Sequence, residues 1–135
     1  MREILFRGKS EKFGNWIEGS LIVGRDLESG QLEYLIAPLS AYYTEVKKVI
    51  PETVGQYTGL TDKNGKHIFE GDIIDTPDRL IQVVWLTGNA QFDFNFIRYA
   101  HDIIITNFKG IYMRDLKEYE VIGNIHDNPE LLGGE

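Results

Sequence analysis

The alternation of apolar and polar residues predicts short β-strands along most of this chain. The clearest case is Gln91–Ile97, where Phe92, Phe94 and Phe96 alternate with polar residues and therefore lie on one face of a strand. Leu80–Leu86 is a short, β-branched apolar run that ends at a turn, so the two segments predict a hairpin with one aromatic face. Further strands are predicted at Arg2–Gly8, Trp16–Val23, Gln31–Ala37, Asp72–Asp75, Asp102–Asn107 and Tyr119–His126.

Two segments depart from this pattern. In Ala41–Ile50 the apolar residues have helical spacing, but adjacent tyrosines and Thr44 favour a strand, so both conformations stay open. Asn128-Pro129 is typical of a helix start, because proline suits the first helical position, and one helical turn is predicted through Leu132. Many short strands between turn signals predict a mainly β fold. We expect a small, partly open antiparallel barrel or sandwich with an N-terminal β portion and a short C-terminal helical turn.

The length and composition predict one folded domain. At 135 residues a single domain, 1–135, is expected, although Pro51 is a candidate seam between the N-terminal β portion and a more compact, barrel-like C-terminal part. The chain has no cysteine, which excludes disulfides, thiolate metal sites and cysteine nucleophiles. No segment approaches the roughly 20 apolar residues of a membrane helix, and the N-terminus lacks the pattern of a signal peptide. We therefore expect a cytoplasmic protein that does not bind a membrane.

The net charge of −7 makes nucleic acid an unexpected partner, because binding along a phosphate backbone depends on Lys and Arg. The charge is also uneven along the chain. Residues 1–17 carry four basic and two acidic side chains, whereas residues 115–135 carry six acidic side chains and one lysine. Complementary ends permit head-to-tail contact between copies, and the alternative is that both ends are simply solvated.

The segment Thr53–Ile74 concentrates residues with special backbone roles. Asn64-Gly65 predicts a type I′ hairpin turn, because both residues tolerate a positive φ, and Asp62 precedes it where its carboxylate can accept hydrogen bonds from the amides of the turn. In Glu70-Gly71-Asp72 the glycine permits a sharp turn into the next strand. The Asp72 carboxylate is then expected to cap local amides. Structural roles are thus the favoured interpretation of this segment.

The same segment supports a catalytic alternative. Together with Asp75, which directly follows it, the segment supplies a candidate metal or acid–base cluster of Asp62, His67, Glu70, Asp72 and Asp75. Carboxylates bind Mg²⁺ or Mn²⁺ and assist phosphoryl chemistry, so a metal-dependent enzyme on nucleotides or nucleic acid would use Glu70, Asp72 and Asp75. Against this, the spacing fits no calcium loop, and Asp72 and Asp75 face opposite sides of an extended strand.

Other catalytic arrangements find less support. The three histidines, His67, His101 and His126, are far apart in the sequence. His101 and Asp102 would form a base with an orienting carboxylate only if the fold brought the two side chains together, because neighbours on a strand diverge. We therefore assign no catalytic residue from these patterns.

The aromatic face gives a further hypothesis. Phe92, Phe94 and Phe96, with Trp85, resemble a platform on which a barrel sheet stacks single-stranded bases. Such platforms are surrounded by basic residues, which are few here, so a buried core face is the expectation. If one or two of these rings are exposed, a protein–protein contact becomes the better interpretation.

Two segments resemble a known family. TVGQYTGLTDKNGKHIFEGDII at 53–74 and YEVIGNIHDNPELL at 119–132 are similar to the YopX-like family of bacteriophage and prophage proteins. The start of the chain and the segments around Trp85 and Phe92 also fit, whereas residues 24–50 and 97–118 carry little of the resemblance. The resemblance implies a mainly β fold with a small, SH3-like barrel part, and a place in the cytoplasm of the bacterial host. The family has no established activity, so no catalytic, metal-binding or cofactor-binding residue follows from it.

The leading hypothesis is therefore a non-enzymatic interaction module. We expect a homo-oligomer that binds an unknown host or phage protein, without a cofactor. The sequence does not specify the partner or the stoichiometry.

Overall fold

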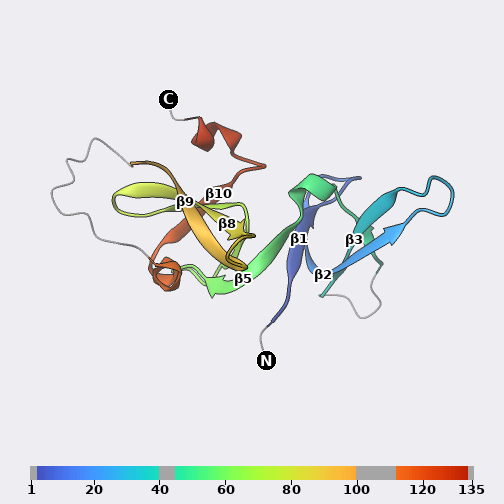
Figure 1. Ribbon diagram of the computed structural model, residues 1–135, viewed down its shortest axis with the longest axis horizontal. Coiled ribbons are helices and arrows are strands. Elements are labelled where there is room, and N and C mark those ends of the chain that lie inside the picture. The colour runs from blue at the N-terminus through green and yellow to red at the C-terminus, as the bar shows by residue number, and fades with distance from the viewer. Residues whose placement is uncertain (1–2, 40–44, 100–111, 134–135) are drawn as a thin grey trace. The chain divides into compact units, whose positions relative to one another are not determined.

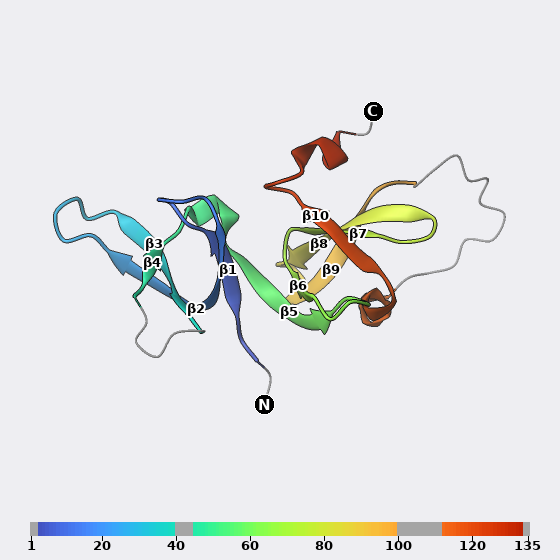
Figure 2. The ribbon, with the colours of Figure 1, turned by 180° about the vertical axis from the view of Figure 1, so that it is seen from behind.

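The computed structural model describes residues 3–39, 45–99 and 112–133 (Figure 1; Figure 2). The chain forms two compact units, Met1–Tyr57 and Thr58–Glu135, and each is described by itself. Antiparallel strands dominate both units, which confirms the predicted mainly β fold. Within the described ranges, no helix is long and apolar enough to cross a membrane.

The elements follow one another as short strands and single helical turns. The strands are β1 (Phe6–Lys9), β2 (Trp16–Arg25), β3 (Leu32–Pro38), β4 (Lys47–Lys48), β5 (Gly55–Thr61), β6 (His67–Phe69), β7 (Asp72–Asp75), β8 (Arg79–Leu86), β9 (Gln91–Tyr99) and β10 (Glu120–Asn124). The 3₁₀ turns are η1 (Pro51–Thr53), η2 (Met113–Glu118) and η3 (Pro129–Leu132). Asn128 is the N-cap of η3, with proline at its start, which confirms the predicted C-terminal helical turn.

The first unit is one antiparallel sheet with the strand order β4-β3-β2-β1-β5. Its small core lies on the face that carries Gly8 and Ile36, where Ile36 and Val49 are fully buried. A Cβ atom on Gly8 would lie 3.0 Å from the Cβ of Val49. Glycine at this position therefore lets Val49 pack directly onto β1.

The ambiguous segment 41–50 is extended where it is described. β4 pairs with β3 through Lys48 opposite Leu35, and Val49 forms a β-bridge with Ser10. Because Val49 is β-branched and buried against the sheet, strand pairing outweighs the helical spacing of the apolar residues. Residues 40–44 lie outside the described part.

The second unit holds the sheet β10-β7-β8-β9, and the later part of β5 lies beside β6. The predicted hairpin is confirmed: β8 pairs with β9, with Val83 opposite Phe94 and Trp85 opposite Phe92. Among the described strands, β10 and β9 are the two edges, so this sheet is open, as predicted. The predicted strand Asp102–Asn107 lies outside the described residues.

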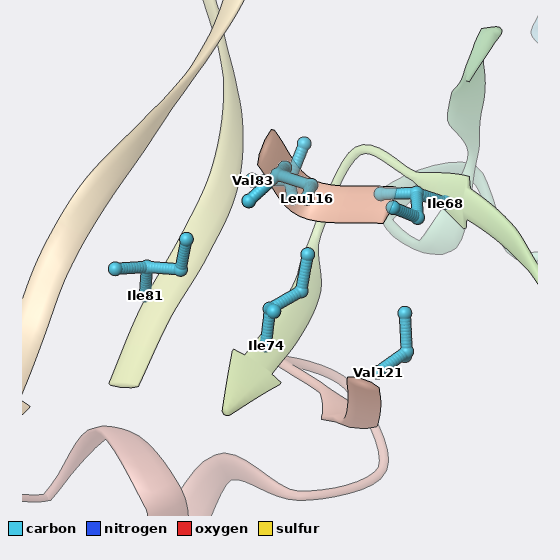
Figure 3. Packing of buried hydrophobic residues seen from close by; sticks show 6 residues of the cluster. All are labelled: Ile68, Ile74, Ile81, Val83, Leu116 and Val121. Carbon is cyan, nitrogen blue, oxygen red and sulfur yellow. The ribbon is translucent and has the colours of Figure 1, made fainter. Parts of the chain in front are cut away.

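The second unit has a compact apolar core drawn from several elements (Figure 3). Side chains from β6, β7, β8, η2 and β10 meet there: Ile68, Ile74, Ile81, Val83, Leu116 and Val121. Full burial of such a side chain contributes about 1.5–3 kcal/mol. The core thus packs η2 and β10, from the end of the chain, against the earlier strands β7 and β8.

The turn at Asn64-Gly65 differs from the prediction. Gly65 has a φ of 79°, but Asn64 does not have a positive φ, so the predicted type I′ turn is wrong. The Gly65 amide donates to the Asp62 carbonyl at 3.0 Å, and the Asp62 amide donates to the Lys66 carbonyl at 2.8 Å. A single left-handed glycine therefore closes a longer loop, because one extra residue in the turn supplies the twist of the hairpin.

Gly71 is the sharp turn that was predicted before β7. Its φ is 93°, a conformation that side chains rarely adopt. Its amide donates to the Val83 carbonyl at 2.9 Å, and its carbonyl accepts from the Ile125 amide at 2.9 Å. The backbone of this one residue thus joins β8 to the segment that follows β10.

Replacing Gly71 is expected to destabilise the second unit. Alanine in a left-handed conformation costs about 1–2 kcal/mol, so Gly71→Ala should lower the free energy of unfolding by that amount. Urea unfolding, followed by the fluorescence of Trp85 in a Trp16→Phe background, measures the change. Gly88→Ala is the control, since Gly88 has no positive φ and no neighbouring atom that a Cβ would meet. Equal stabilities of the two alanine variants would contradict the role of Gly71.

Candidate functional site

The Asp62 carboxylate is buried and accepts hydrogen bonds from three backbone amides. Oδ1 accepts from Asn64 N at 2.8 Å and from Lys66 N at 2.9 Å, which confirms the predicted bracing of the turn. Oδ2 accepts from Val121 N at 3.1 Å. No local pattern of residues predicts this last bond, which joins the turn to β10.

These donors determine the charge state of Asp62. Burial alone raises the pKa of a carboxyl, but the amides of Val121, Lys66 and Asn64 and the charge of Lys66 together outweigh burial and hold the pKa of Asp62 below its ordinary value. The group is therefore an ionised structural acceptor near neutral pH. A second hydrogen bond strengthens the same junction, since Lys63 N donates to the Tyr119 carbonyl at 2.9 Å.

The other acids of the predicted cluster diverge. Asp72 is fully buried, and its Oδ2 accepts from Phe69 N at 2.8 Å, which confirms the predicted amide cap. Asp75, on the same strand, is exposed, and His67 and Glu70 are half-buried. Within the described ranges, no three His, Cys, Asp or Glu side chains are grouped so as to hold a metal ion. The pair His101 and Asp102 lies outside those ranges.

The aromatic face of the hairpin is only partly buried. Phe94 packs against the core, but Trp85 is 42% exposed and Phe96 is 53% exposed, so the expectation of a wholly buried face is wrong. The physical reason is the sheet order: β9 is an edge strand among the described elements and lies farther from the core than β8. Trp85 and Phe92 meet edge to face at 4.9 Å between ring centroids. We refer to Trp85, Phe92 and Phe96 as the aromatic strip.

A groove lies where the β7–β8 turn approaches η2 and β10. Its volume is about 300 Å³, and it is lined by Lys63, Asp75, Thr76, Pro77, Glu118, Tyr119 and Glu120. We call it the acidic groove. Three of its residues are carboxylic acids, and its one lysine lies with Nζ 3.8 Å from Glu120 Oε2.

The pairing of β10 with β7 brings two of these acidic side chains together. Glu120 lies directly opposite Asp75 in the antiparallel register, and like charges so placed repel. Burial raises the pKa of Tyr119, and the nearby Glu118 and Asp115 raise it further, so its phenol stays neutral at physiological pH. The groove therefore combines negative charge with an uncharged aromatic ring, which is a setting that favours a cation.

Sequence reasoning found only part of this surface. Of the groove residues, only Asp75 was a candidate, because the others come from three segments whose proximity depends on strand order. The signal that existed was the excess of acids in residues 115–135. This excess indicates that the surface is negatively charged, but it does not indicate that the acids line a groove.

Comparison with known proteins gives a family and a similar fold. The sequence model of the family described as YopX protein matches residues 5–133. Among solved structures, the chain is similar to protein EF1440 from Enterococcus faecalis, with 25% sequence identity, a TM-score of 0.55, and coverage of 98% of this chain and 99% of that chain. A comparison with curated proteins found no match. Neither description specifies a reaction or a ligand.

Removal of the Asp62 carboxylate is expected to destabilise the second unit strongly. Asp62→Ala leaves the buried amide of Val121 and the partly buried amides of Asn64 and Lys66 without their acceptor, so we expect a loss of about 2–3 kcal/mol. Asp75→Ala is the control, because this exposed carboxylate should contribute less than about 0.5 kcal/mol. Equal losses for the two variants in urea unfolding would contradict the structural role.

The contribution of Asp62 should also depend on pH. Because its pKa is lowered in the folded state, the stabilisation is complete above the ordinary pKa of 3.8 and is lost as the pH falls through the lower folded pKa. The stability difference between wild type and Asp62→Ala should therefore be constant near neutral pH and shrink in acid below about pH 4. Unfolding titrations at several pH values measure it. A difference that grows in acid would contradict this sign.

Proposed function

This chain belongs to the YopX protein family, and we propose that it is a non-enzymatic interaction protein of phage or prophage origin that binds a host or phage protein through the aromatic strip. The observation that supports this proposal best is the exposure of Trp85 and Phe96 on ordered, paired strands.

Exposed aromatic rings on a rigid sheet are typical of contact surfaces. Trp and Phe are enriched in the centres of protein interfaces, and tryptophan is prominent among the residues whose truncation costs most affinity. Trp85 is held by its edge contact with Phe92, and both lie on hydrogen-bonded strands. Little conformational entropy is therefore lost when a partner covers them.

The positions and hydrogen bonds of the acidic residues argue against the metal-dependent enzyme. The buried carboxylates of Asp62 and Asp72 accept hydrogen bonds from backbone amides, while Asp75 is exposed. Carboxylates that bind Mg²⁺ must share one coordination sphere within a few ångströms, and no three acidic or histidine side chains of the described residues are grouped in that way. The hydrogen bonds of Asp62 and Asp72 thus favour a structural interpretation of these two acids over a metal site.

Charge argues against the single-stranded nucleic-acid alternative. Residues 58–135, which include the aromatic strip, hold seven basic and thirteen acidic side chains, a net charge of −6. Such a unit repels a phosphate backbone, and few bases would reach the rings without basic residues to guide the strand. A protein partner requires no such neutralisation.

The expected consequence is that one substitution in the aromatic strip abolishes partner capture. Trp85→Ser should weaken binding by roughly thirtyfold or more, the effect of losing an interface centre worth about 2 kcal/mol. The measurement is affinity capture from a bacterial host lysate with the purified chain as bait, followed by titration of the retained protein. In a Trp16→Phe background, the emission of Trp85 should shift to shorter wavelength as the partner covers it.

The matched control is Ile122→Ser, which removes an equally exposed apolar side chain from β10, the other edge of the same sheet. This variant should retain the partner. A partner held equally by wild type, Trp85→Ser and Ile122→Ser would show that the aromatic strip is not the contact surface.

A further inference from the structure

The turn between β1 and β2 presents a cation and an aromatic ring together. Phe13 is 72% exposed, and Lys12 Nζ lies 5.3 Å from the centroid of its ring. Both side chains extend from the segment Ser10–Asn15, which we call the Lys12–Phe13 turn. An exposed aromatic ring with an ammonium group at its face is a compact group with two kinds of affinity, one apolar and one for negative charge.

Hydrogen bonds within this turn, and one to the neighbouring strand β4, hold its backbone in place. Ser10 N donates to the Asn15 carbonyl at 2.8 Å, and Gly14 N donates to the Ser10 carbonyl at 2.8 Å. The Ser10 hydroxyl accepts from Phe13 N at 3.1 Å, and Glu11 N donates to the Lys48 carbonyl at 3.0 Å. The exposure of Phe13 is therefore a built feature of an ordered turn, so docking it costs little conformational entropy.

The acidic groove has the complementary chemistry. Asp75 and Glu120 oppose each other across β7 and β10, and Lys63 forms an ion pair with Glu120. Among the described residues, the carboxylates of Asp75 and Glu118 have no ion-pair partner. A further cation in the groove would offset the repulsion between the strands. Tyr119 and Pro77 supply an apolar wall beside these charges.

We propose that the acidic groove of one copy receives the Lys12–Phe13 turn of a second copy. The Lys12 ammonium lies toward Asp75 and Glu118, and the Phe13 ring packs on Tyr119 and Pro77. A volume of about 300 Å³ lies at the small end of ligand sites and suits one or two side chains. Glu11, the acid of the same turn, lies 3.7 Å from Lys48 Nζ, and the net charge of −6 on residues 58–135 attracts the Lys12 ammonium to this unit.

The contact is head-to-tail, because the turn and the groove are different surfaces of the chain. An open assembly therefore has one free turn at one end and one free groove at the other, unless it closes into a ring. The proposal specifies the self-association that the sequence analysis expects, and it does not use the aromatic strip. Trp85→Ser should therefore leave self-association unchanged, so this proposal and the proposed function fail independently.

Sedimentation velocity over a concentration series tests the contact. The wild-type protein should associate more as its concentration rises, and added salt should weaken the association, because exposed charges are screened. Lys12→Glu and Glu118→Lys should each weaken association at least tenfold. An equimolar mixture of these two variants should associate again, since the reversed turn fits the reversed groove and the native turn fits the native groove.

The restored mixture is the decisive observation, because a contact within one chain cannot be rescued by a second chain. Leu27→Ser is the control: it removes a fully exposed apolar side chain from the β2–β3 turn and should change nothing. Asp75→Lys replaces Glu118→Lys if thermal unfolding shows that the latter is not folded. A monomeric wild type at every concentration, association that persists in both charge variants, or a mixture that stays monomeric overturns the proposal.

Discussion

The carboxylate of Asp62 is the interaction on which most of the second unit depends. One oxygen closes the turn after β5, and the other holds the amide of Val121 at the start of β10, fifty-nine residues along the chain. Val121 then enters the core, and its strand pairs with β7. If this carboxylate were removed, the turn would lose two acceptor contacts and β10 would lose its anchor, so the core and the rim of the groove would loosen together.

A buried charge without a buried cation is costly unless its lone pairs are satisfied. Here backbone amides satisfy them: the amides of Asn64 and Lys66 in the turn, and the amide of Val121 in β10. The same junction shapes the acidic groove. Lys63 and Tyr119 both line the groove, and a backbone hydrogen bond joins them next to the Asp62 carboxylate. The hydrogen bonds that stabilise the unit therefore also position residues of the acidic groove.

Local patterns predicted the local parts of this fold, and long-range pairing decided the rest. The alternation in Gln91–Ile97 identified β9 because side-chain period depends only on the strand itself. The exposure of Phe96 depends on whether β9 is central or at an edge, which the pattern does not contain. Likewise, the residues of Asp62 and its turn predicted local amide bonds, but not the bond to Val121. The acidic groove could not be predicted for the same reason, because it forms only when β10 pairs with β7.

Sequences usually satisfy local rules of stability, and the places where they do not are where function is expected. Two such places lie in the second unit: Asp75 faces Glu120 across a strand pair, and Trp85 stays substantially exposed on a rigid hairpin. The repulsion between Asp75 and Glu120 lowers stability, and a bound cation would offset it. The exposed ring of Trp85 gains little from folding, and an apolar partner surface would supply the missing burial. Catalysis would instead require groups that converge on one reacting atom. Two separate and unlike surfaces therefore support the proposal of a recognition role.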